Sequence, residues 1–155
     1  MKFFMGIDLS LSESGVVILD NDARIIKQSI ISTLSKDDIE CRLLFIKEEI
    51  KIILDEFKDV VVFMEGLSFA SKGQGMLQLG ALHYFIRIFL YENKFKYQVI
   101  PPTKLKKFVC TGKAKKELML KEVYKKWNFD TDNNNIADAY SLARMVLEEY
   151  KEIED

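Results

Sequence analysis

The run Val-Val-Val-Phe-Met at residues 60–64 constrains the fold more than any other segment of the chain. A short β-branched apolar run of this kind is typical of a strand that is buried on both faces. It directly follows a helical pattern, because apolar residues recur at spacings of three and four from Ile39 to Phe57. A further strand pattern lies upstream at residues 2–8. A strand, a long helix and a second buried strand predict a right-handed crossover unit.

The segment before that helix predicts an antiparallel meander. Residues 2–8, Gly15–Leu19 and Arg24–Ile31 each have the length and apolar content of a strand. Short connections separate them, and Asp20-Asn21-Asp22 is a turn signal. The first three strands of the sheet are therefore expected to be antiparallel.

The second half of the chain is mostly helical in pattern. The segment Met76–Tyr91 is apolar almost all round, which is typical of a helix that is buried centrally or lies at a subunit interface. Tyr97–Ile100 predicts a fifth strand, which ends at Pro101 and Pro102. The remaining helices are expected at Thr103–Val109, Ala114–Trp127 and Asn135–Lys151. The whole predicts an α/β three-layer domain of the ribonuclease H-like type, in which helices flank a five-stranded mixed sheet.

Length and composition favour one globular domain over residues 1–155. The chain is 48% hydrophobic and 30% charged, an ordinary composition for a folded domain. No apolar run approaches the roughly 20 residues of a membrane helix, so no membrane association is expected. Asp8 interrupts the apolar N-terminal stretch, which argues against a secretory signal. Cys41 and Cys110 lie far apart, so two reduced thiols in a cytoplasmic protein are expected rather than a disulfide.

Charge is distributed unevenly along the chain. Residues 94–127 contain eleven lysines and two glutamates, a net charge of +9, although the whole chain carries −1. Such a segment indicates binding to a polyanion. The alternative is a lysine-rich surface that is simply solvated.

Two acids directly end predicted strands, and a third lies in the last helix. Asp8 and Glu65 follow apolar strands, and Asp138 lies between alanines that would allow this helix to pack closely on the sheet. Strand ends on one edge of an α/β sheet face a common crevice. Three converging carboxylates are suited to Mg²⁺ or Mn²⁺, and two-metal phosphodiester cleavage needs such a cluster. The alternative for each acid alone is a turn former or a helix cap.

Four segments, taken in order, resemble the RuvC family of Holliday-junction resolvases. They are GIDLSLSESGVV at residues 6–17, MEGLSF at 64–69, PPTKLKKFVCTGKAKK at 101–116 and IADAYSLA at 136–143. The resemblance spans about residues 3–146. Within the family, the sequence is similar in character to the phage-encoded RuvC-like endonucleases. It implies a homodimeric, Mg²⁺-dependent endonuclease in a bacterial host's cytoplasm, with Mn²⁺ as a possible substitute. Such an enzyme resolves Holliday junctions and related branched DNA by paired symmetric nicks that leave 5′-phosphate ends.

The resemblance also implies roles for individual residues. Asp8, Glu65 and Asp138 match the family's metal-binding carboxylates. The family carries an Asp or His three residues before the last acid, whereas this chain has Asn135. An amide oxygen can bind a hard cation but brings no charge. Asp132 is the nearest acid that could compensate.

Lysines and one aromatic match the family's DNA-contacting positions. Lys116 matches a catalytic lysine near the scissile phosphate, and either Lys106 or Lys107 matches a second. The predicted DNA-binding lysines are Lys72, Lys104, Lys106, Lys107, Lys113, Lys115 and Lys116; the alternative for several is a solvated helix face. Phe69 matches an aromatic that contacts unpaired bases at the junction centre, and loop packing is its alternative.

The apolar helix is expected to form the dimer interface. Its second face, with Leu79, Leu82, His83 and Ile86, is predicted to lie across a two-fold axis. Two other functions remain open: a junction-binding protein that does not cleave, and a related nuclease acting on forks, flaps or RNA. A sugar-kinase or actin-like ATPase is disfavoured, because 155 residues leave no room for a second lobe.

Overall fold

The structure is a computed structural model that describes residues 1–68 and 72–154. Its strands form one sheet in the order β3-β2-β1-β4-β5. The pairs β1–β2 and β2–β3 are antiparallel, and β1–β4 and β4–β5 are parallel, so the predicted mixed sheet is confirmed. The strands are β1 (Phe3–Asp8), β2 (Glu13–Leu19), β3 (Ile25–Ser32), β4 (Val60–Glu65) and β5 (Lys96–Ile100).

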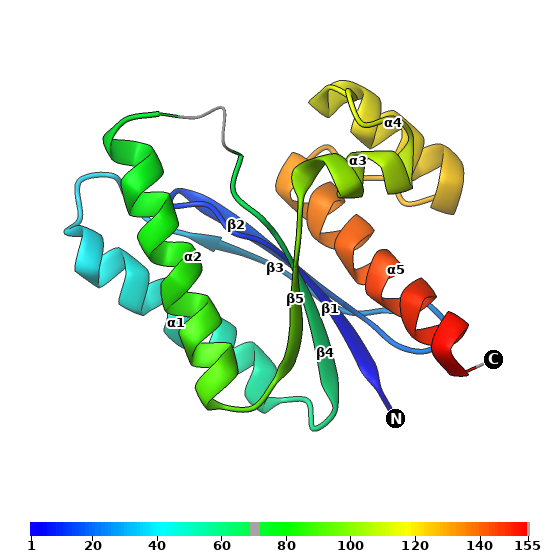
Figure 1. Cartoon of the computed structure of the whole chain (residues 1–155), viewed down its shortest axis with the longest axis horizontal. Coiled ribbons are helices and arrows are strands. Elements are labelled where there is room, and N and C mark those ends of the chain that lie inside the picture. The colour runs from blue at the N-terminus through cyan, green and yellow to red at the C-terminus, as the bar shows by residue number, and fades with distance from the viewer. Residues whose placement is uncertain (69–71, 155) are drawn as a thin grey trace.

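Helices cover both faces of the sheet, which gives the three layers expected from the sequence (Figure 1). One face carries α1 (Ile39–Asp55) and α2 (Gln74–Glu92). The other carries α5 (Asn134–Glu154), with α3 (Pro102–Val109) and α4 (Lys116–Trp127) beside it. Within the described residues, no helix is both long enough and apolar enough to cross a membrane.

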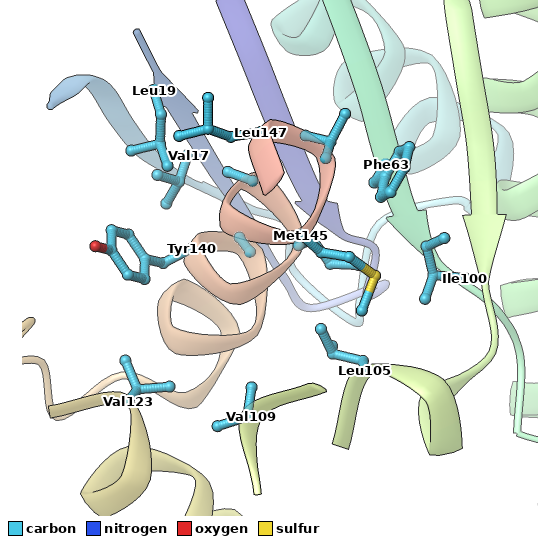
Figure 2. Close-up of a cluster of buried hydrophobic side chains, with 14 of the residues drawn as sticks. Val17, Leu19, Phe63, Ile100, Leu105, Val109, Val123, Tyr140, Met145 and Leu147 are labelled. Atoms are coloured by element: carbon cyan, nitrogen blue, oxygen red, sulfur yellow. The ribbon is translucent and has the colours of Figure 1, made fainter. Parts of the chain in front are cut away.

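Each face of the sheet has its own hydrophobic core, because side chains alternate along a strand. Met5 and Ile18 pack toward α1 and α2, whereas Phe4, Val17 and Phe63 pack toward α5. Figure 2 shows the second core, in which Tyr140, Met145 and Leu147 of α5 lie among side chains from β2, β4, β5, α3 and α4. The run at residues 60–64 is almost wholly buried, as its composition predicts.

Two glycines allow α5 to approach the sheet at close range. A Cβ atom on Gly6 of β1 would lie 1.9 Å from the carbonyl oxygen of Ala139. A Cβ atom on Gly15 of β2 would lie 2.3 Å from the carbonyl oxygen of Asn135. No side chain fits at either position, so the backbones of β1 and β2 contact the first turns of α5 directly. This contact sets the position of Asp138.

Candidate active site

Three acidic side chains meet at one edge of the sheet. Asp8 is the last residue of β1 and Glu65 is the last residue of β4. These strands are parallel neighbours, with Ile7 opposite Met64, so both acids leave the sheet at the same edge. Asp138 reaches them from the second turn of α5, and one oxygen atom from each carboxylate lies within 4.8 Å of the others. The structure therefore brings together the three acids singled out in the sequence.

Burial and mutual repulsion make these carboxylates unusually basic. The pKa of Asp8 is raised well above its ordinary value by burial, and then by the charges of Glu65 and Asp138. Burial and the charge of Asp138 raise the pKa of Glu65 to about 7. Asp8 and Glu65 also share a side-chain hydrogen bond. This bond raises the pKa of Asp8 and lowers that of Glu65, as expected when a protonated Asp8 donates to Glu65. Burial raises the pKa of Asp138 to about 6.

The charge of this cluster is only partly balanced by protein groups. Lys116 lowers the pKa of all three acids, and Lys106 lowers those of Glu65 and Asp138, but burial outweighs both lysines. Buried like charges are costly unless a cation or a proton joins them. The oxygen donors, their number and their spacing fit a hard divalent cation such as Mg²⁺. A cavity of about 690 Å³ opens beside the three acids, and the Ser10 and Asn135 side chains also line it.

The structure decides which of the lysines lie at the site. Lys106 of α3 and Lys116, the first residue of α4, line the cavity together with Lys113 and Lys115. Of Lys106 and Lys107, between which the sequence left the choice open, Lys106 is therefore the one that lies beside the three acids.

Two of the predicted DNA-binding lysines lie elsewhere. Lys104 and Lys107 line a separate hollow against the C-terminal half of α5, with Glu148 and Glu149. Lys104 Nζ lies 2.9 Å from Glu149 Oε1, so this lysine is paired with a glutamate. The structure thus brings neither lysine to the carboxylates.

Among the other described residues that the sequence predicted to bind metal or DNA, one lies at the cavity and two do not line it. Asn135 lines the cavity, as its position in the motif implies. Asp132 is exposed and belongs to neither the carboxylate cluster nor the cavity lining, so it does not supply the missing acid. Lys72 is exposed and lies outside the cavity lining, and Phe69 falls outside the described residues.

Two supporting residues escaped the sequence analysis. Asn133 caps α5, because its Oδ1 accepts a hydrogen bond from the backbone N–H of Ile136 at 3.0 Å. Its Nδ2 donates to Glu13 Oε1 at 2.9 Å, which ties the start of α5 to the start of β2. An asparagine just before a helical pattern is a usual cap signal and could have identified it. Ser10 lines the cavity; it lies in the first motif segment, two residues after Asp8, but no role was assigned to it from the sequence.

The predicted interface residues of α2 are corrected by the structure. Leu82, His83 and Ile86 are buried inside the protomer, where Leu82 and Ile86 belong to the core beneath the helix. They cannot form an intersubunit surface, so this part of the prediction is wrong. Leu79 is half-buried and lines a smaller cavity that also contains Asp8 and Glu65. The helix does have a second apolar face, and its exposed members are Leu77, Tyr84, Ile88 and Tyr91.

The sheet order and the clustered carboxylates define a ribonuclease H-like protein whose acidic site is bordered by lysines. A family model described as "Crossover junction endodeoxyribonuclease RuvC" matches residues 4–145. The chain belongs to this RuvC family, and it is an enzyme of the crossover junction endodeoxyribonuclease class, a hydrolase. The family predicted from the four motifs is confirmed.

Solved structures agree with this fold. Thermus thermophilus RuvC is 17% identical, with a TM-score of 0.81 over 97% of this chain and 96% of that one. T. thermophilus RuvC in complex with a Holliday junction substrate is 16% identical, with the same TM-score and coverage. The yeast mitochondrial Holliday junction resolvase Ydc2 is 14% identical, with a TM-score of 0.57 over 96% of this chain and 83% of that one. No curated protein sequence matches the chain.

Proposed function

We propose that this enzyme resolves Holliday junctions and related branched DNA by Mg²⁺-dependent hydrolysis, with paired symmetric nicks that leave 5′-phosphate ends. The observation that carries the proposal is the cluster of Asp8, Glu65 and Asp138, half-buried and only partly neutralised, at the edge of a lysine-lined cavity. Family membership supports the junction as substrate, and so does the T. thermophilus RuvC structure in complex with a Holliday junction. The expected setting is the cytoplasm of a bacterial host.

The carboxylates and lysines divide the work of hydrolysis. Asp8, Glu65 and Asp138 would hold the metal, and Asn135 and Ser10 are the neutral oxygen donors beside them. When bound, Mg²⁺ lowers the pKa of a coordinated water and offsets charge on the phosphate. Lys116 and Lys106 already act electrostatically on the acids, so they would also contact a phosphate oxygen placed there. Lys113 and Lys115 extend this positive border and would bind phosphates of the DNA backbone.

Paired nicks call for two active sites related by a two-fold axis, so we propose a homodimer. The surface for it is the exposed stripe on α2 formed by Leu77, Tyr84, Ile88 and Tyr91. These residues are spaced at seven, four and three, which places them along one face of the helix. A stripe of large exposed apolar side chains is typical of an interaction surface.

The test compares cleavage of four-way, forked and linear DNA by wild type and Asp8→Asn, in Mg²⁺ and in EDTA. Wild type should cut the four-way junction in Mg²⁺ alone. Asp8→Asn should lose at least about 100-fold in rate, because it removes charge where the cation must bind. It should retain junction binding, since the phosphate contacts come from lysines. Binding without cleavage by wild type would favour the non-cleaving alternative, which the uncharged Asn135 makes worth testing.

A further inference from the structure

A second cavity of about 490 Å³ lies between α2, β5 and the start of α3. A smaller cavity of about 250 Å³ joins it to the active site, because the two share Gly66, Leu67 and His83 while the smaller one reaches Asp8 and Glu65. A DNA strand whose phosphate lies at the carboxylates therefore has space beside it for an adjoining nucleotide. None of the catalytic roles assigned above uses this second cavity.

The walls of the second cavity are mainly apolar. Leu67, Val99, Pro101 and Pro102 are the apolar side chains that line it. Such walls suit a flat, weakly hydrated ring and not a phosphate, which the nearby lysines would bind better. Most ligand pockets combine apolar walls with a few polar groups that fix orientation.

Three polar residues of this cavity, His83, Tyr84 and Arg87, come from α2, and Ser68 and Thr103 also line it. Arg87 is half-buried, and its guanidinium carbon lies 4.5 Å from the centre of the Tyr84 ring. Its Nε is buried and has no hydrogen-bond partner among the described residues, so this donor is unsatisfied in the protein on its own. Burial and the charge of Arg87 lower the pKa of His83 to about 4, so its ring is neutral near pH 7 and can both donate and accept.

We propose that this cavity receives an unpaired nucleobase adjoining the scissile phosphate, and that Arg87 reads its carbonyl oxygen. Arginine recognises bases through carbonyl and ring-nitrogen acceptors, and discrimination by such contacts is substantial. Enzymes that do chemistry on a DNA base take the unstacked base into a pocket that stacks on its faces and binds its edge, so a protein cavity can hold a base in this way. Adenine, the one DNA base without a carbonyl group, should be the base this cavity accepts least. The inference rests on the proposed function, since it assumes that the carboxylates mark the cut.

The experiment uses full-length protein and four-way junctions of fixed sequence. The nucleotide on each side of the cut is varied through A, C, G, T and an abasic site. On one side only, wild type should cut the adenine and abasic junctions about tenfold more slowly than the others. Arg87→Gln and Arg87→Lys should bring these rates to within about twofold of one another. Arg87→Lys keeps the charge but loses the planar fork.

Arg24→Gln is the matched control, because Arg24 lies by the β2–β3 turn at the opposite end of the sheet from Asp8. It should keep the wild-type pattern. Melting temperatures show that each variant is folded. Base preferences that are absent in wild type, or unchanged by both Arg87 variants, would overturn the inference. So would a loss of dimer in sedimentation that accompanies the loss of base preference, which would place Arg87 in the subunit interface.

A second measurement separates this inference from the proposed function. Binding of the same junctions is measured in EDTA, where no cleavage is expected. Wild type could cut no junction and yet bind the abasic and adenine junctions less tightly than the others. If Arg87→Gln then removes this difference in affinity, the proposed cleavage activity is contradicted while the base-binding cavity is supported. If cleavage occurs while neither rate nor affinity depends on the adjoining base, the pocket fails and the nuclease stands.

Discussion

Asn135 lies where the resemblance to the RuvC family implies an Asp or a His. It lines the cavity beside three acids but brings no charge to them. Charge count is a main determinant of affinity for hard divalent cations. The site should therefore need more Mg²⁺ than a site with four charged ligands.

Asn135→Asp should lower the Mg²⁺ concentration for half-maximal cleavage by about tenfold. In EDTA the same change should lower the melting temperature, because it adds a fourth acid to an incompletely neutralised cluster. Asp132→Asn is the matched control and should change neither quantity, since Asp132 is exposed and lies outside the cluster. An unchanged Mg²⁺ requirement in Asn135→Asp would remove Asn135 from the metal site.

The raised pKa values of the cluster predict how stability depends on pH. The folded pKa values of Glu65 and Asp138, about 7 and about 6, exceed the ordinary 4.5 and 3.8. The folded state therefore binds more protons than the unfolded state between about pH 4 and pH 7. The free energy of unfolding of metal-free protein should fall as the pH rises through this window.

Denaturant unfolding in EDTA checks this sign. Asp138→Asn should be more stable than wild type at pH 8 by on the order of 1–3 kcal/mol, because it removes a buried charge. The two proteins should converge only below the ordinary pKa of 3.8, where Asp138 is protonated in the folded and in the unfolded state. Added Mg²⁺ should reverse the order at pH 8. A variant less stable than wild type at pH 8 in EDTA would contradict the electrostatic account.

At the scale of elements, the contact of α5 with β1 and β2 fixes the third acid in place. Gly6→Ala would place a methyl group 1.9 Å from a backbone oxygen of α5, so the helix must move away. Unfolding free energy should fall by about 1–3 kcal/mol or more. Cleavage at saturating Mg²⁺ should also fall, because Asp138 moves with the helix.

Gly80→Ala provides the comparison for that change. Gly80 lies inside α2, where a Cβ would make only an ordinary contact, 3.9 Å from Leu67. Alanine should stabilise the protein by up to about 1 kcal/mol through helix propensity, with cleavage unchanged. Denaturant melts and single-turnover rates measure both effects. Equal stability in Gly6→Ala and wild type would mean that α5 can slide on the sheet.

The strands and the acids that end them could be predicted from the sequence because both are local signals. Runs such as residues 60–64 show burial directly, and the parallel β1–β4 pair then places Asp8 beside Glu65. Two features could not be predicted. Leu82 and Leu77 lie on opposite sides of a helix that is apolar all round, so periodicity cannot say which side meets the sheet. Lys106 and Lys107 are adjacent, and only the docking of α3 on α5 separates them.

At the scale of the whole molecule, the exposed stripe on α2 places the proposed two-fold axis on the helix that borders the active site. Ile88→Glu puts a charge within this stripe, where in the proposed dimer it would be buried against the partner subunit. Burying such an uncompensated charge costs several kcal/mol. The variant should stay folded, sediment as an 18.0 kDa monomer and make isolated nicks instead of paired cuts.

Ile52→Glu is its control. Ile52 lies on α1 outside the stripe and is 54% exposed, against 53% for Ile88. It should remain dimeric and cut both strands. Sedimentation velocity and the ratio of nicked to resolved product report the two properties. A wild-type monomer with full resolving activity would contradict the dimer.

The direct contact of α5 with β1 and β2 also orders events during synthesis of the protein. Asp138 enters the site on a helix that leaves the ribosome after every strand of the sheet, and this helix forms much of one core. A nascent chain that has exposed only its strands carries Asp8 and Glu65 without their third partner. On the proposed function, a chain whose last helix has not yet docked lacks the complete carboxylate cluster and should therefore be unable to cut DNA.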